Sequence, residues 1–209
     1  MKRTSTRCLL LTVLALWLCP AAASEINCGP LANAFGPLDY RTATASDRAL
    51  VDDAHFTEPV ETLKRGQTSS TPGGDLDYTL RAFPNHPRAL SAVSRYAIRH
   101  GTSKPPQLRW SVDCYFDRAF RFQPSDPMPV MLYGVHLART GRHGDAIEYL
   151  EKAARNPIDD PNFHYNLGLG FFEVKRYEQA LVHAKQAYAA GFPLPGLRNR
   201  LHGVGAWKD

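Results

Sequence analysis

The sequence lacks the short motifs that mark common catalytic sites. It contains no G-x-S-x-G, no H-E-x-x-H, no Walker loop and no G-x-G-x-x-G that opens a βαβ unit. Gly168 and Gly170 lie inside an apolar, helix-like stretch, where glycine allows close packing rather than phosphate binding. The sequence therefore predicts a protein that is not an enzyme and that holds no cofactor and no metal.

A long apolar segment is also missing. The apolar run from Cys8 to Cys19 is shorter than the about 20 residues that span a membrane. It follows a basic start and precedes Ala21-Ala22-Ala23, so residues 1–23 are predicted to be a cleaved signal peptide. A retained anchor and lipidation of Cys19 are the alternatives, although Leu18 stands where a lipidation signal has a small residue. We expect a secreted or periplasmic protein.

The mature chain carries little net charge. Without residues 1–23, Lys and Arg fall from 25 to 22 against 20 acidic residues, so the formal net charge falls from +5 to +2. The sequence has no lysine–arginine run of the kind that follows a phosphate backbone. We therefore expect neither nucleic-acid binding nor stable membrane insertion after signal cleavage.

Cysteine is scarce, with four residues in 209. Cys8 and Cys19 leave with the signal peptide, so Cys28 and Cys114 remain, 86 residues apart. An even pair in an oxidising compartment favours a disulfide. Two separate buried thiols are the alternative, and two lone cysteines lack the paired spacing of a metal site.

The last third of the chain repeats itself at a fixed interval. Four positions recur 34 residues later with the same residue: Pro127, Gly134, Ala146 and Ala153 return as Pro161, Gly168, Ala180 and Ala187. The interval and the small residues resemble the tetratricopeptide-repeat family, whose unit is a helix-turn-helix of that length. The front of the chain is similar to that of secreted bacterial members of the family. The resemblance implies an all-α solenoid of helix pairs.

The mature chain divides into three parts on this basis. Residues 24–86 form a loop and helical segment, residues 87–194 form about three repeats, and residues 195–209 form a capping helix. In the first part, helices are expected at 47–55, at 57–66 and from Asp75 onward, with a linker at 67–74. The repeats are 87–126, 127–160 and 161–194; the first is degenerate, with an insertion from Thr102 and a second helix that begins at Trp110.

The family resemblance also implies a binding face. The first helices of such repeats line a concave surface, which is basic at one end of this chain and apolar-aromatic at the other. It suits a peptide or protein partner in cell-envelope assembly, with arginines that bind a carboxylate. The residues implied are Arg88, Ser91, Arg95, Ile98, Arg99, Met128, Met131, Val135, Ala138, Arg139, Asn162, Tyr165, Leu169, Phe172 and Glu173.

Three alternatives to an open binding face stay open. Met128 and Phe172 could pack against the N-terminal segment, so that the chain fills its own groove. An enzyme or metal site could use His55, His86 or His100 between that segment and the repeats. The repeats could also stack on a second copy of the chain. The histidine pairs His136/His143 and His164/His183 each fall within one repeat, but two ligands do not make a stable zinc site.

Overall fold

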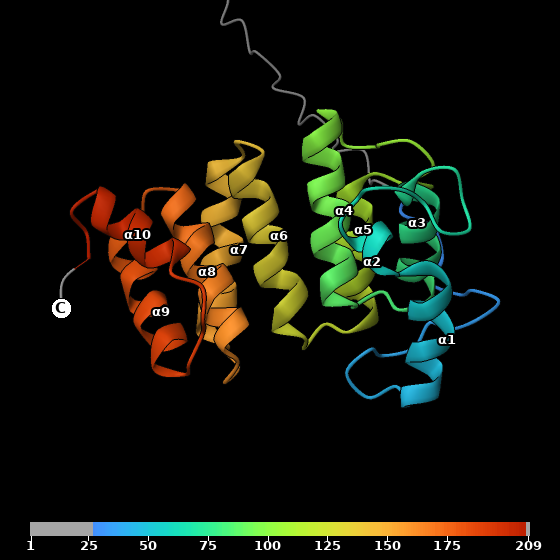
Figure 1. Ribbon diagram of the computed structural model, residues 1–209, viewed down its shortest axis with the longest axis horizontal. Coiled ribbons are helices and arrows are strands. Elements are labelled where there is room, and N and C mark those ends of the chain that lie inside the picture. Colours follow the sequence, from blue (N-terminus) through green and yellow to red (C-terminus); the bar gives the residue numbers. More distant parts are fainter. Residues whose placement is uncertain (1–26, 208–209) are drawn as a thin grey trace, which may run out of the picture.

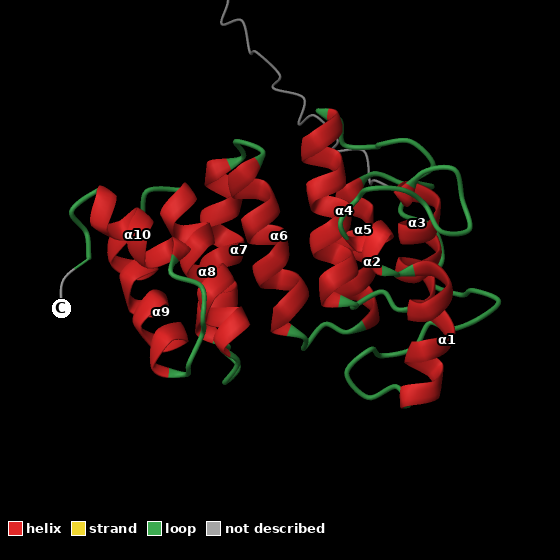
Figure 2. Cartoon of the chain, viewed as in Figure 1, coloured by secondary structure: helices red, strands yellow, loops and turns green. Residues whose placement is uncertain are grey.

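The structure, a computed structural model, describes residues 27–207 and contains ten helices and no strand in that range. Figure 2 shows the helices joined only by loops. The all-α prediction is confirmed, whereas the predicted signal peptide lies outside the described residues. The helices are α1 Ala45–His55, α2 Glu58–Glu61, α3 Pro72–Ala82, α4 Pro87–His100, α5 Val112–Phe122, α6 Pro127–Arg139, α7 His143–Arg155, α8 Pro161–Glu173, α9 Tyr177–Ala189 and α10 Gly196–Gly203.

Two closely packed helix pairs make up the C-terminal half. Helix α6 packs against α7, α8 packs against α9, and α6 and α8 lie side by side (Figure 1). Both α6 and α8 begin at a proline, and the carboxylates of Asp126 and Asp160 cap their first backbone N–H groups. These starts are the positions that the repeat in the sequence predicts.

Glycines let the helices of each pair approach closely. A Cβ at Gly134 would lie 2.9 Å from the side chain of Leu150 on α7, and a Cβ at Gly168 would lie 3.2 Å from the Ala180 carbonyl oxygen on α9. Leu150 is fully buried and fills the space beside Gly134. A methyl group at these positions would push the helices apart, which explains why small residues recur there.

The first helix pair, α4 and α5, has a long connection. Helix α4 ends at His100, and Gly101 follows in a left-handed conformation (φ 62°) that suits glycine. Helix α5 begins only at Val112, where the side chain of Ser111 caps the N–H of Cys114. The expectation that Trp110 begins this helix is therefore wrong, because the capping serine comes after it. The guanidinium of Arg118 instead lies over the Trp110 ring, 4.2 Å from the centre of that ring.

Helices α1 to α3 pack at the α4 end of the molecule (Figure 1). Helix α2 has only four residues, not the ten expected at 57–66, because Leu63 adopts a left-handed conformation (φ 60°) that a helix cannot continue through. Helix α3 begins at Pro72, within the expected linker. A Cβ at Gly73 would collide with the Pro106 carbonyl oxygen, so glycine allows this start to pack closely.

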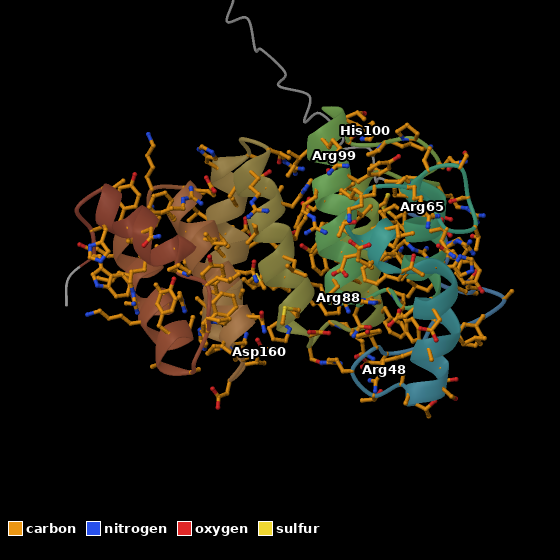
Figure 3. All side chains as sticks on the ribbon, in the orientation of Figure 1. Arg48, Arg65, Arg88, Arg99, His100 and Asp160 are labelled. Atoms are coloured by element: carbon orange, nitrogen blue, oxygen red, sulfur yellow. A yellow bond between two sulfur atoms is a disulfide. The ribbon has the colours of Figure 1, made fainter. Side chains whose placement is uncertain are left out.

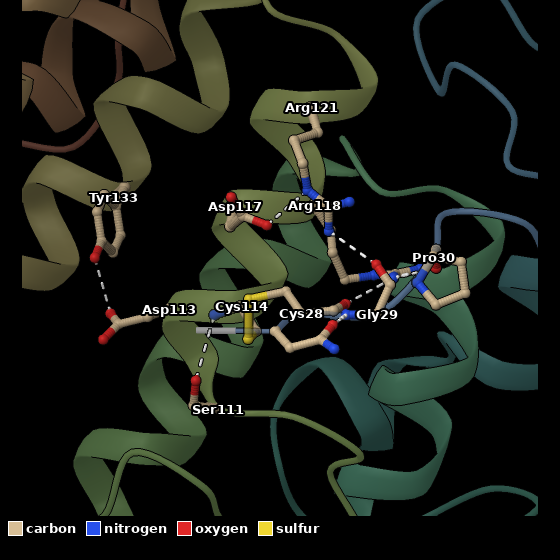
Figure 4. Close-up of a disulfide and its surroundings, with 11 residues drawn as sticks. Cys28, Gly29, Pro30, Ser111, Asp113, Cys114, Asp117, Arg118, Arg121 and Tyr133 are labelled. Atoms are coloured by element: carbon tan, nitrogen blue, oxygen red, sulfur yellow. Dashed lines mark hydrogen bonds and ion pairs between the residues drawn. A yellow bond between two sulfur atoms is a disulfide. The ribbon is translucent and has the colours of Figure 1, made fainter. Parts of the chain in front are cut away.

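A disulfide joins the N-terminal loop to α5. Cys28 and Cys114 lie with their sulfurs 2.10 Å apart and their Cα atoms 5.0 Å apart, as the cysteine count predicts (Figure 4). Beside them, the buried Arg118 guanidinium donates to the carbonyl oxygens of Cys28 and Pro30, at 3.1 and 2.6 Å. Burial lowers the pKa of Arg118. The loop at Cys28 to Pro30 is therefore joined to α5 by one covalent bond and by hydrogen bonds to its backbone carbonyl groups.

Helix α10 closes the C-terminal end. Leu197 and Leu201 are fully buried against α8 and α9, whereas Val204 is exposed. The apolar spacing predicts the first two correctly, but the helix ends at Gly203, before Val204. Within residues 27–207, no helix combines the length and apolar character needed to cross a membrane.

Candidate binding face

Helices α4, α6 and α8 lie next to one another and carry the residues of the predicted binding face (Figure 1). We call their shared surface the first-helix face. Arg88, Arg95, Arg99, Arg139 and Asn162 are exposed on these helices. Met128, Tyr165, Leu169 and Phe172 are half-buried, and Met131 and Val135 are buried in the core. The exposed part of the face is therefore mostly basic.

The α4 arginines hold a segment of the protein's own chain. Arg88 forms an ion pair with the carboxylate of Glu61, and its Nε donates to Glu61 at 2.7 Å. Arg95 donates to the carbonyl oxygen of Glu61 and Arg99 to that of Leu63, both at 2.7 Å. Arg88 and Arg99 lie toward opposite ends of α4 (Figure 3). Residues 58–63 thus follow the α4 surface and bind it through one carboxylate and two carbonyl groups.

The opposite end of the face is covered from the C-terminal side. Tyr165 stacks on Phe192 with ring centres 4.0 Å apart, and the Arg200 guanidinium lies 4.2 Å from the ring centre of Phe172. Arg200 also donates to Glu173 at 2.9 Å. The N-terminal segment therefore covers the α4 arginines, while α10 and the turn before it cover the aromatic residues. Sequence spacing gave no signal for this second cover.

Three arginines meet where α4 approaches α6. Burial lowers the pKa of Arg95, Glu61 opposes that change, and the charges of Arg139 and Arg99 lower the pKa further. Arg95 and Arg99 donate to carbonyl oxygens, and Arg139 has no acceptor among the described residues. We call Arg95, Arg99 and Arg139 the arginine cluster. Among residues 27–207, no carboxylate forms a hydrogen bond or an ion pair with any of the three.

A cleft of about 390 Å³ opens beside Arg139. Its walls come from the ends of α4 and α6 and the starts of α5 and α7, and they include Ala97, Ile98, Ser103, His136 and Arg142. The first residues of the connection 101–111 also line the cleft. The Gln107 side chain accepts from the backbone N–H of Thr71 at 2.9 Å and donates to Ser70, which holds this connection against the start of α3.

The polar groups deep in the cleft already have partners. The Asp113 carboxylate accepts from the Tyr133 hydroxyl at 3.0 Å and from Arg142 at 2.9 Å. Burial and the charge of Asp113 raise the pKa of Tyr133. His136 bonds through Nδ1 to the Ser94 hydroxyl at 2.9 Å, and burial lowers its pKa, which keeps the ring neutral. Among the charged side chains that line the cleft, Arg139 is the one with no acceptor in residues 27–207.

The three histidines of the alternative enzyme or metal site lie in separate networks. His55 bonds to Asp75 at 3.0 Å, His86 faces Asp52 at 3.3 Å, and His100 bonds to the carbonyl oxygen of Tyr96. In residues 27–207, no group of three or more His, Cys, Asp or Glu side chains is placed to hold a metal ion.

The His55–Asp75 pair also lacks the arrangement of a catalytic triad. Burial acts against ionisation of Asp75, but hydrogen bonds from Thr68, Ser69 and His55 keep its pKa at about 2. The Thr68 hydroxyl lies 3.1 Å from Nδ1 of His55, the same nitrogen that faces Asp75. In a triad the nucleophile and the carboxylate contact opposite ring nitrogens. This network orders the loop 67–71 instead.

His164 and His183 form a buried pair between α8 and α9. Their Nδ1 atoms lie 3.1 Å apart, and Nδ1 of His183 also lies 3.0 Å from the Gln186 side-chain oxygen. Burial and then the neighbouring His164 lower the pKa of His183 to about 4, and burial lowers that of His164. Both rings are therefore neutral at neutral pH and share one hydrogen bond. Their spacing within one repeat indicates this contact in the sequence.

Comparisons with protein-family models, curated proteins and solved structures find no match to this chain.

Proposed function

We propose that this protein is an exported, tetratricopeptide-type binding module that captures a protein or peptide through its first-helix face, in the service of cell-envelope assembly. The support for the repeat assignment is the 34-residue interval and the packing of α6, α7, α8 and α9 around Gly134 and Gly168. The disulfide supports export, because disulfides persist in oxidising compartments. The apolar and basic start of the sequence supports a signal peptide at 1–23.

One observation carries the proposal. The first-helix face already holds a short segment of polypeptide, residues 58–63, through the side chains of Arg88, Arg95 and Arg99. Guanidinium groups that donate to carbonyl and carboxylate oxygens are a general means of holding a peptide. The same face continues past this segment to Arg139 and Asn162, which are exposed. It therefore has the chemistry to hold a second chain beside the first.

A site-specific photocrosslink tests the proposal. A photoreactive residue replaces Asn162 on α8, and the matched control replaces Lys185, which is exposed on α9 outside the face. In the native cell envelope, we expect one saturable partner to crosslink at position 162 and to be displaced by excess unmodified protein. Equal crosslinking at position 185, or a crosslink at 162 to the protein's own chain alone, would contradict a partner-binding role for this face.

The histidine-based enzyme or metal alternative receives no comparable support. His55 bonds to Asp75, His86 faces Asp52, and His100 bonds to the carbonyl oxygen of Tyr96, so the three lie in separate places. Metal analysis of the purified protein tests this alternative, since stoichiometric metal would favour it over the binding module.

A further inference from the structure

The own-chain segment leaves the charge of the first-helix face unbalanced. Residues 58–63 bring one carboxylate, that of Glu61, to the row formed by Arg88, Arg95, Arg99 and Arg139, and it binds Arg88. The next two arginines receive carbonyl oxygens only, and Arg139 receives no acceptor among residues 27–207. Guanidinium groups remain charged at all physiological pH values, and the Glu61 carboxylate offsets only part of their mutual repulsion.

Nearby acidic groups do not supply that anion. Asp113 lies in the same cleft, but Arg142 and Tyr133 bind both of its oxygens between them. Asp145 lies 3.1 Å from Arg142 in a second ion pair. Arg139 of the cluster therefore lines a cleft in which Asp113 and Arg142 are already paired with each other.

The cleft adds an apolar wall beside the cluster. Ile98 is 40% exposed although it lies between Arg95 and Arg99, and Ala97 lines the cleft behind it. A volume of about 390 Å³ is within the range of small ligand pockets and accommodates one or two side chains. The site therefore offers cations next to an apolar surface, a combination that suits an acidic residue followed by an apolar one.

We propose that the arginine cluster binds a side-chain carboxylate of an acidic partner segment, whose neighbouring apolar side chain enters the cleft against Ala97 and Ile98. This inference rests on the proposed binding function and names the class of partner: a peptide segment that alternates Glu or Asp with aliphatic residues. The ion pair of Arg88 with Glu61 is the same recognition made within the chain.

Two capped peptides test the inference, acetyl-Leu-Glu-Leu-Glu-Leu-amide and its analogue with Gln in place of Glu. Each is titrated into the mature, oxidised protein, and the arginine Nε–Hε signals are followed by NMR. We expect the Glu peptide to shift the signals of Arg95, Arg99 and Arg139 and to bind at least about tenfold more tightly than the Gln peptide. We also expect its affinity to fall as salt is raised.

Variants separate the cluster from general surface charge. Arg139→Gln is expected to lower the affinity for the Glu peptide about tenfold, to the level of the Gln peptide. Arg176→Gln is the matched control, because Arg176 is exposed at the α8–α9 turn, and it should bind as the unmodified protein does. Equal melting temperatures confirm that both variants fold.

Several outcomes would overturn the inference. Equal binding of the two peptides, equal behaviour of the two variants, or shifts at the same three signals with millimolar inorganic phosphate would each exclude a specific peptide-carboxylate site. If a partner crosslinks at position 162 but the Glu peptide does not bind, the proposed binding function is retained and the assignment of an acidic partner segment is wrong. If no partner crosslinks at 162, the proposed function itself fails.

Discussion

The two halves of the molecule are held together in different ways. From α6 to α10, neighbouring helices pack through small and aliphatic residues that are close in sequence, as at Gly134 against Leu150. From Asn27 to α5, the chain is held by bonds that span long separations, such as the disulfide over 86 residues. One hydrophobic core runs through both halves, and the N-terminal half adds a few distant links to it.

Polar side chains supply further long-range links in the N-terminal half. The Asn85 side chain donates to Asp39 at 2.7 Å and to Asp126 at 2.9 Å, while its oxygen accepts from the backbone N–H of Tyr40. Asp126 also caps α6 through its other oxygen. Local packing tolerates the loss of one contact, but a network with few members loses several bonds when one residue changes. The predictions below test that contrast.

Removal of the disulfide is expected to have the largest effect. With Cys28→Ser and Cys114→Ser together, the loop-entropy relation for 86 residues gives a loss of about 4–5 kcal/mol as an upper value. The loss should fall on the N-terminal half. Urea unfolding followed by hydrogen exchange measures it, and uniform loss of protection across α6–α9 would contradict the division into two differently stabilised halves.

Acid should destabilise the α8–α9 pair. The pKa of His183 is about 4 in the folded chain against an ordinary value of 6.5, so the folded state binds a proton less readily than the unfolded state. The free energy of unfolding is therefore unaffected by His183 above pH 6.5. It decreases as the pH falls toward 4, by about 3 kcal/mol in total. Unfolding at successive pH values measures this loss. His183→Gln should flatten the profile, whereas His143→Gln, at an exposed position on α7, should retain it.

Glycine substitutions on α6 and α7 should change the free energy of unfolding in opposite directions. Gly134→Val places atoms against the side chain and backbone N of Leu150, which should destabilise the fold by about 1–3 kcal/mol. Gly144→Ala introduces a Cβ with nothing within 4 Å and should stabilise α7 by about 0.5–1 kcal/mol. Thermal unfolding of both variants checks the pair. A neutral result for Gly134→Val would mean that the helix contact there is loose.

The smallest effect is expected at the own-chain segment. Arg88→Ala removes a largely exposed ion pair with Glu61 and should cost below about 1 kcal/mol of global stability. Hydrogen exchange at the amides of Leu63 and Lys64 should nevertheless become faster, because residues 58–63 lose their carboxylate contact. Arg121→Ala breaks a comparable pair with Asp117 on α5 and should leave those amides unchanged. Equal exchange in both variants would show that Arg88 does not hold the segment.

The repeated half of the chain is the part that sequence predicts well. Pro127 and Pro161 mark helix starts, and Gly134 and Gly168 mark close approaches, because each residue acts through its own backbone or the absence of a Cβ. These effects are local and recur with the interval. The even cysteine count predicts the disulfide for a similar reason, since oxidation leaves few pairing choices.

The candidate site is harder to predict because its members come from distant parts of the chain. The basic positions of α4 are visible in the sequence, but their acceptors, Glu61 and the Leu63 carbonyl oxygen, lie at and just after the end of α2, which stops early before a left-handed residue. Nothing in the spacing predicts that stop. Likewise, the cover over Tyr165 and Phe172 depends on the path of the turn before α10, which has no periodic signal.

Residues 58–63 remain attached to the surface that they occupy, and this makes them a tethered competitor. A short tether keeps a segment at an effective concentration of about millimolar. A free chain that offers only the same carbonyl contacts must exceed that local concentration to replace it. A chain that instead binds beside the segment, at Arg139, meets no such competition. A partner that binds at Arg88, Arg95 and Arg99 must therefore bind tightly enough to displace the segment. A partner that binds at Arg139 does not have to displace it.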